Sequence, residues 1–153
     1  MGTPDFAVPS LEAIARSNHD IAAVVTRPDT ARCRGRKLAS PEVKLAAESL
    51  GIPVLQPEKL RTSTFVDTLS AVGADLFVVV AFAILPKVLL ELPRLGSINL
   101  HPSLLPRYRG AAPINWAIIN GEQETGITTF LLSPKIDAGD ILMQERVAIG
   151  PEE

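Results

Sequence analysis

Residues 76–85 are all apolar, and this run constrains the fold more than any other part of the sequence. The stretch from Asp75 to Phe82 is rich in valine and phenylalanine, which favour β-strands. A strand with apolar side chains on both faces must be covered on both sides, as in parallel sheets flanked by helices. The run is also too short to cross a bilayer as a helix. We therefore expect a buried strand here, covered by helices on both faces.

Strand and helix patterns alternate around this run. The other predicted strands are Asp20 to Thr26, Ser97 to His101, Ile127 to Leu132 and Ile141 to Ile149, and the predicted helices are Phe6 to Arg16, Pro41 to Leu50 and Thr64 to Val72. Ser40 is placed to cap the second helix, with Pro41 at its first position and Gly51 after its end. The alternation predicts an α/β fold with a doubly wound, mostly parallel sheet.

The composition is that of a folded, soluble domain, with 46% hydrophobic and 21% charged residues in a chain of 153. A formal net charge of −2 gives no general attraction to nucleic acids or anionic membranes, so any such contact must be local. Cys33 is the single cysteine, which excludes an internal disulfide and fits a reducing, cytoplasmic location. The N-terminus lacks the order of a signal peptide.

Asn99 and His101 lie at the carboxyl end of a predicted strand, the edge where open α/β sheets bind ligands. Side chains alternate along a strand, so these two point to the same face. An amide beside an imidazole suits a reaction in which a carbonyl oxygen gains charge and a proton moves. A hydrogen-bonded structural role for His101 is the alternative. Asp137 and Asp140 offer carboxylates that would orient the ring, although acidic glycine loops are more often solvated turns.

Two long connections interrupt the pattern, Arg27 to Ser40 with five cationic residues and Pro102 to Gly110 with two prolines and two arginines. Long loops in compact domains are often functional. The sequence contains neither a dinucleotide-binding fingerprint nor a Walker loop, and its two distant histidines do not form a zinc-binding pattern. Dinucleotide, ATP and zinc chemistry are therefore disfavoured.

The segment Asn99 to Gly110 reads Asn-Leu-His-Pro-Ser-Leu-Leu-Pro-Arg-Tyr-Arg-Gly and resembles the signature of formyltransferases that use 10-formyltetrahydrofolate. Asp137 follows His101 by 36 positions, where that family carries its catalytic aspartate. Four further stretches are similar to the methionyl-tRNA branch of the family: Met1 to Pro9, Arg34 to Leu38, Ser40 to Lys44 and Gly110 to Ile114. Cys33 departs from the pattern, because glycine is common there.

The resemblance covers residues 1–153 and implies a partial catalytic domain. It implies that the family's first, central strand is ending where Met1 begins, and that the C-terminal tRNA-binding domain is absent after Glu153. A parallel sheet without its central strand would leave strand edges unpaired. On this interpretation we expect the isolated chain to be marginally stable or prone to aggregation, and inactive even with the catalytic trio intact.

The resemblance also implies a function, the transfer of a formyl group from 10-formyltetrahydrofolate to the amino group of methionine on initiator tRNA, without a metal. Asn99 and His101 would meet the tetrahedral oxyanion, and Asp137 would orient His101 and help to move the amine proton. The other implied site residues are Ser103, Leu104, Leu105 and Pro106 for folate, and Phe6, Arg34, Arg36 and Lys37 for the tRNA substrate.

Two alternatives stay open. A formyltransferase acting on an amino sugar or on glycinamide ribonucleotide would share the trio and the Ser-Leu-Leu-Pro loop, although a small sugar needs no basic loop. A catalytically silent fragment would bind folate or RNA without turnover. Folate binding without formyl transfer would favour the silent fragment.

Overall fold

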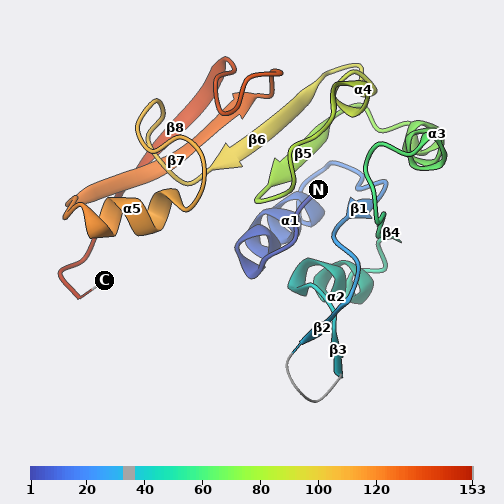
Figure 1. The fold of residues 1–153 in the computed structure, drawn as a ribbon, viewed down its shortest axis with the longest axis horizontal. Helices are drawn as coiled ribbons and strands as arrows, with labels where there is room; N and C mark the ends of the chain where they lie inside the picture. Colours follow the sequence, from blue (N-terminus) through green and yellow to red (C-terminus); the bar gives the residue numbers. More distant parts are fainter. Residues whose placement is uncertain (33–36, 153) are drawn as a thin grey trace.

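The computed structural model describes residues 1–32 and 37–152. Short strands and helices alternate along the chain (Figure 1). The strands are β1 (Val24–Val25), β2 (Thr30–Arg32), β3 (Lys37–Ala39), β4 (Val54–Leu55), β5 (Phe77–Val80), β6 (Ser97–His101), β7 (Glu124–Leu131) and β8 (Ile141–Ala148). The helices are the 3-10 helix η1 (Asp5–Ala7) and the α-helices α1 (Val8–Ala15), α2 (Glu42–Ser49), α3 (Ser63–Val72), α4 (Lys87–Leu90) and α5 (Pro113–Ile119).

The main sheet has the strand order β5-β6-β7-β8. Strands β5 and β6 are parallel, whereas β7 and β8 each run antiparallel to their neighbour. Strands β1 and β4 form a separate parallel pair. Met1 and Gly2 lie between the two sheets, because the Gly2 amide donates to Val25 and the Val80 amide donates to Met1. The predicted α/β fold is confirmed, with an antiparallel extension at β7 and β8.

Helices cover both faces of β5. Phe77 and Val79 belong to a buried cluster with Phe65 and Leu69 of α3. Val80, on the other face, packs in a second cluster with residues of α1 and α2. The run that is apolar on both faces is thus the buried strand that the sequence predicts, and it ends at the same sheet edge as His101.

Several boundaries differ from the sequence predictions. The strand expected from Asp20 to Thr26 shortens to β1, because its partner β4 offers only two residues for pairing. Helix α2 begins at Glu42 with Pro41 as its N-cap, so Ser40 does not cap it as predicted. The patterns did not predict β4, α4, α5 or the β2–β3 ribbon, which are short and lack a clear period.

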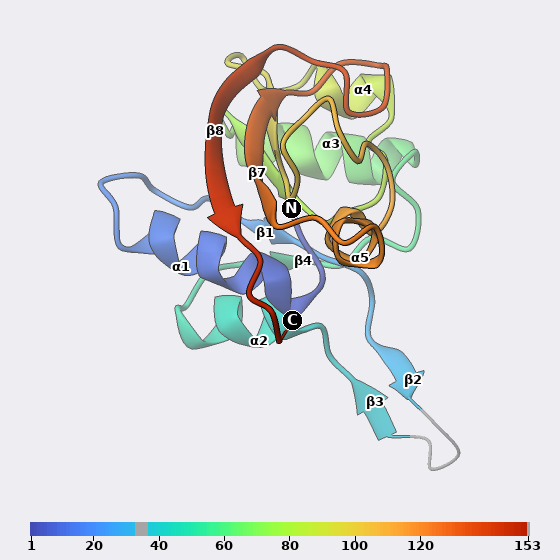
Figure 2. The ribbon, with the colours of Figure 1, turned by 90° about the vertical axis from the view of Figure 1, so that its left-hand side faces the viewer.

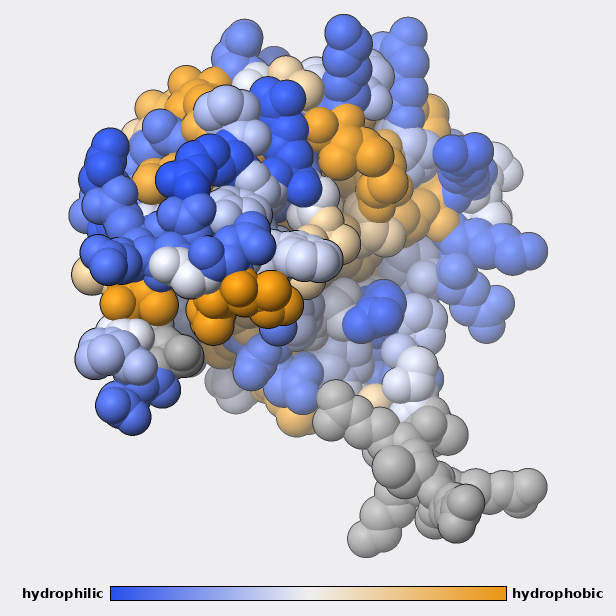
Figure 3. All heavy atoms as spheres, turned by 60° about the vertical axis from the view of Figure 1, so that its left-hand side comes forward, coloured by the Kyte–Doolittle hydropathy of each residue, from blue (hydrophilic) through white to orange (hydrophobic). Residues whose placement is uncertain are grey.

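Helix α5 buries Pro113 and Ala117 and exposes its larger apolar side chains, among them Trp116 and Ile119. On the face that Figure 3 shows, apolar patches lie between hydrophilic side chains. Within residues 1–32 and 37–152, no helix has the length and apolar character needed to span a membrane.

Candidate active site

His101 ends strand β6 at the carboxyl edge of the sheet, with β5 on one side and β7 on the other. Its side chain is buried. Asn99 is half-buried. It stands two positions earlier in the same strand, so the two side chains share a face as predicted. Among the described residues, the Asn99 side chain has no hydrogen-bond partner. Its amide is therefore available to a ligand.

The two ring nitrogens of His101 have different neighbours. Nε2 lies 2.8 Å from the carbonyl oxygen of Tyr108. Because a carbonyl only accepts, Nε2 carries a hydrogen and donates it. Nδ1 lies 3.8 Å from Oδ2 of Asp137, too far for a direct hydrogen bond. Nδ1 is thus the nitrogen that can take up or release a proton, and it faces a carboxylate.

Asp137 is fixed by a second contact. Its Oδ2 accepts a hydrogen bond from the Gly110 amide at 2.8 Å, and its side chain is only 14% exposed. Its φ of 44° lies in the left-handed region, which aspartate tolerates better than most residues. The loop that starts at Pro102 and the loop that contains Asp137 therefore meet at His101.

Gly139 allows the Asp137 loop to lie directly on β7. A Cβ atom at this position would overlap the carbonyl oxygen of Leu131. The Leu131 amide donates to the Asp140 carbonyl at 2.9 Å, so Asp140 contributes its backbone here. The Asp-Ala-Gly-Asp pattern, a weak turn signal in the sequence, thus fixes Asp137 against the sheet.

The loop from Pro102 to Gly110 folds onto β7. The hydroxyl of Ser103 donates to the Arg107 carbonyl at 2.7 Å, and the hydroxyl of Thr128 contacts the backbone of Ser103 and Leu105. The four residues predicted to contact folate divide into two pairs: Ser103 and Leu105 are buried, while Leu104 is half-buried and Pro106 exposed. A ligand on this loop would meet Leu104, Pro106 and the backbone.

Gly126 makes room for this loop in the middle of β7. A Cβ atom there would overlap the side chain of Leu104 and the carbonyl oxygen of Glu145 on β8. The glycine therefore lets the loop and the neighbouring strand approach β7 at the same point.

The outer end of the loop is tied to the turn after α5. Glu122 accepts hydrogen bonds from Arg107 and, at 2.7 Å, from the Tyr108 hydroxyl. Asn120 donates to the same hydroxyl at 3.1 Å. Sequence reasoning did not single out Tyr108, although its carbonyl orients His101. A backbone acceptor leaves no residue-type signal, so only the structure could identify it.

The predicted substrate-binding residues lie elsewhere. Phe6, in η1, is half-buried against the cluster of α1 and α2. Arg34 and Arg36 lie outside the described residues, and only the backbone of Lys37 is described, as the first residue of β3. The β2–β3 ribbon that leads to them projects from the body of the molecule (Figure 2).

A polar cluster holds the base of this ribbon. Lys44 contacts Asp29 at 2.7 Å, and Gln56 donates to Asp29 at 2.8 Å and to the Arg27 carbonyl at 2.8 Å. The Gln56 hydrogen bond and the Lys44 contact lower the pKa of Asp29, and Asp29 raises the pKa of Lys44. The cluster therefore fixes where the ribbon leaves the domain.

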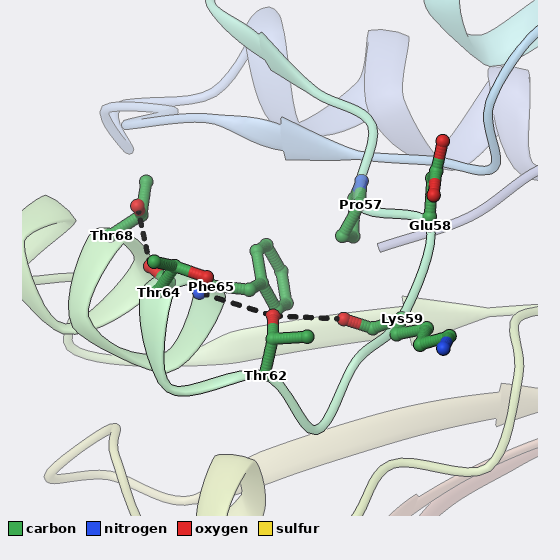
Figure 4. A pocket seen from close by; sticks show the side chains of 7 residues that line it. All are labelled: Pro57, Glu58, Lys59, Thr62, Thr64, Phe65 and Thr68. Carbon is green, nitrogen blue, oxygen red and sulfur yellow. Dashed lines mark hydrogen bonds between the residues drawn. The ribbon is translucent and has the colours of Figure 1, made fainter.

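Two hollows lie outside the His101 site. One, of about 350 Å³, lies at the start of α3, where the Thr62 hydroxyl accepts from the Phe65 amide (Figure 4). The other, of about 280 Å³, lies between the turn after Gly2 and the ribbon base, and its lining includes the buried Thr3. None of the predicted catalytic residues lines either hollow.

Comparison with known proteins identifies the family. The formyl transferase family model matches residues 1–153, so the chain belongs to the formyl transferase family. A methionyl-tRNA formyltransferase from Syntrophus aciditrophicus is 55% identical over all of this chain and 49% of its own length. One from Geobacter metallireducens is 56% identical over all of this chain and 50% of its own length. The chain thus spans about half the length of these relatives.

A solved structure shows the same fold at lower identity. The phosphoribosylglycinamide formyltransferase from Bacillus halodurans aligns with a TM-score of 0.79 over 99% of this chain and 79% of its own. The two sequences are 21% identical, so this likeness establishes the fold alone. The Rossmann-like formyltransferase fold expected from the resemblance is confirmed.

Proposed function

We propose that residues 1–153 form the catalytic part of an enzyme that transfers a formyl group from 10-formyltetrahydrofolate to the amino group of methionyl initiator tRNA. The observation that carries the proposal is the grouping of a free amide, a buried imidazole and a carboxylate at one strand end. The high identity to methionyl-tRNA formyltransferases supports this choice of acceptor.

The proposed reaction uses the three side chains in sequence. The amine attacks the formyl carbon, and the oxygen becomes an oxyanion that the Asn99 amide and a protonated His101 stabilise by donating hydrogen bonds. The amine then loses a proton, N10 of the folate gains one, and the bond between N10 and the formyl carbon breaks. Asp137 orients the Nδ1 side of the protonated His101 and helps to move the amine proton to N10 through water. Positioning and electrostatics supply the catalysis, so this scheme uses no metal.

The binding roles follow from exposure and charge. Folate would lie on the Pro102 loop, touching the accessible Leu104 and Pro106, while the buried Ser103 and Leu105 would shape the loop beneath it. Phe6 and the cations Arg34, Arg36 and Lys37 would contact the aminoacyl end and the phosphates of the tRNA. We expect this activity in the cytoplasm, where initiator tRNA is charged.

A chimaera tests the proposal. This chain is joined after Glu153 to the second half of the Geobacter metallireducens relative, and formyl transfer to methionyl initiator tRNA is measured. An Asn99→Ala variant should lose roughly 100-fold in kcat/KM, because an oxyanion donor is removed. Transfer to glycinamide ribonucleotide or to an amino sugar that is faster than transfer to methionyl initiator tRNA would show that the proposed acceptor is wrong. Folate binding without transfer to any acceptor would indicate the silent fragment.

A further inference from the structure

Thr128 is a fully buried hydroxyl in the sheet beside the candidate active site. It lies on β7, directly opposite His101 of β6 and Gln144 of β8. A buried threonine in a strand ordinarily only packs against its neighbours, and the sequence around Thr128 does not indicate a functional role. Its position between these two residues makes its hydrogen bonds informative.

The Thr128 hydroxyl uses its full hydrogen-bonding capacity. It donates to the Ser103 carbonyl at 2.6 Å and accepts from the Leu105 amide at 3.1 Å and from the Gln144 side chain at 3.0 Å. A hydroxyl has one donor and two acceptor positions, so all three are occupied. One side chain of the sheet thereby fixes the backbone of the loop at two residues.

Gln144 completes the arrangement from the next strand. Its amide nitrogen also donates to the Leu105 carbonyl at 2.8 Å. Both backbone polar groups of Leu105 are therefore held by Thr128 and Gln144. Removing either partner would leave loop backbone groups without a partner at a largely buried place, which costs free energy.

The fixed loop leads directly to His101. The Ser103 amide donates to the His101 carbonyl, and the Ser103 hydroxyl holds the Arg107 carbonyl. The next residue is Tyr108, with a φ of 55°, and its carbonyl accepts from Nε2 of His101. The direction of this carbonyl selects the tautomer of His101, and it depends on the path of the loop.

We infer that Thr128 and Gln144 are positioning residues for His101. They hold the loop so that the Tyr108 carbonyl keeps the hydrogen on Nε2 and leaves Nδ1 facing Asp137. A catalytic contribution of this device rests on the proposed function, whereas its effect on the imidazole does not.

The imidazole signals of the 153-residue chain test the inference. The chain has two histidines, and His19 is exposed, so His19 serves as an internal reference in nitrogen-15 NMR. In Thr128→Val, which keeps the shape but removes the hydroxyl, we expect the Nε2-H tautomer of His101 to lose population while His19 is unchanged. Thr128→Ser should restore the wild-type signals.

A matched control and a second variant make the result decisive. Thr129→Val removes the neighbouring hydroxyl on the opposite face of β7 and should leave His101 unchanged. A folded Thr128→Val with wild-type His101 signals would overturn the inference. If Thr128→Val does not fold, the His101 signals of Gln144→Met, a variant on the exposed strand β8, test the inference instead. We expect a smaller change in the same direction, and unchanged His101 signals would overturn the proposal.

The same variants in the chimaera separate this inference from the proposed function. Thr128→Val should lower kcat roughly 10-fold to 100-fold, as expected when a reacting group is misplaced, and Thr128→Ser should recover most of it. An altered His101 signal in a chain without transfer activity would support the positioning role and contradict the proposed function. Full transfer activity of Thr128→Val with an unaltered His101 signal would support the proposed function and contradict the positioning role.

Discussion

The two long loops of the molecule are held in different ways. The loop from Pro102 to Gly110 lies on the sheet, and buried hydrogen bonds from Thr128 fix its backbone. In the connection from Arg27 to Ser40, strands β2 and β3 project as a ribbon, and the hydrogen bonds to Asp29 hold its base. Reacting groups must be placed within a fraction of an ångström, whereas phosphate contacts act through charge and tolerate movement. On the proposed function, the first loop would position reacting groups and the second would contact tRNA phosphates.

The largest expected effect is at the site beside the first loop, where His101 and Asp137 meet. His101→Ala and Asp137→Ala, each in the chimaera, should lower kcat/KM for formyl transfer at least about 100-fold, because both remove proton-transfer or oxyanion groups. Circular dichroism should show an intact fold. Near-normal rates for both variants would remove these two side chains from the mechanism.

The Asp137 loop packs directly on β7, so a larger residue in the contact should greatly reduce stability. Gly139→Ala should lower the free energy of unfolding by about 3 kcal/mol or more, because the new methyl group overlaps the Leu131 backbone. Gly51→Ala is the matched control. It has open space around its Cβ position but a φ of 70°, so about 1 to 2 kcal/mol is expected. Equal losses in urea denaturation would show that the loop can move away from the strand.

The cations predicted to bind tRNA should affect the salt dependence of tRNA binding. Replacing Arg34, Arg36 and Lys37 by alanine should flatten the dependence of tRNA affinity on salt by up to roughly 2 to 3 in logarithmic slope, because fewer counterions are released. Folate binding should not change. An unaltered slope would identify these three cations as solvated surface charges.

The smallest effect is expected at the ribbon base. The pKa of Asp29 is lowered in the folded state, so its charged form stabilises the fold above its unfolded-state pKa. Asp29→Asn should therefore melt slightly below wild type at pH 7. The difference should shrink as the pH falls below about 4, where the unfolded carboxylate takes up its proton. A difference in melting temperature that does not shrink at all on acidification would exclude the charge as its cause.

The sequence was most informative where a pattern is local. Alternation along a strand predicted that Asn99 and His101 share a face, and the two-sided apolar run predicted β5. The resemblance pointed to Asp137, which the structure places beside His101. Thr128 and Gln144 escaped notice because their contacts join three strands and a loop, and an isolated threonine or glutamine in a strand looks ordinary. Long-range pairing of this kind leaves no periodic signal.

Gly126 has a consequence for how this sequence can change over time. A side chain at this position would overlap two neighbours, Leu104 of the loop and the backbone of Glu145 in β8. A smaller residue at 104 would relieve only one of them, so no single compensating replacement can accommodate a larger residue at 126. We expect glycine to be invariant at this position among active relatives. Positions such as Gly51 and Gly73, with open space around them, should exchange with asparagine.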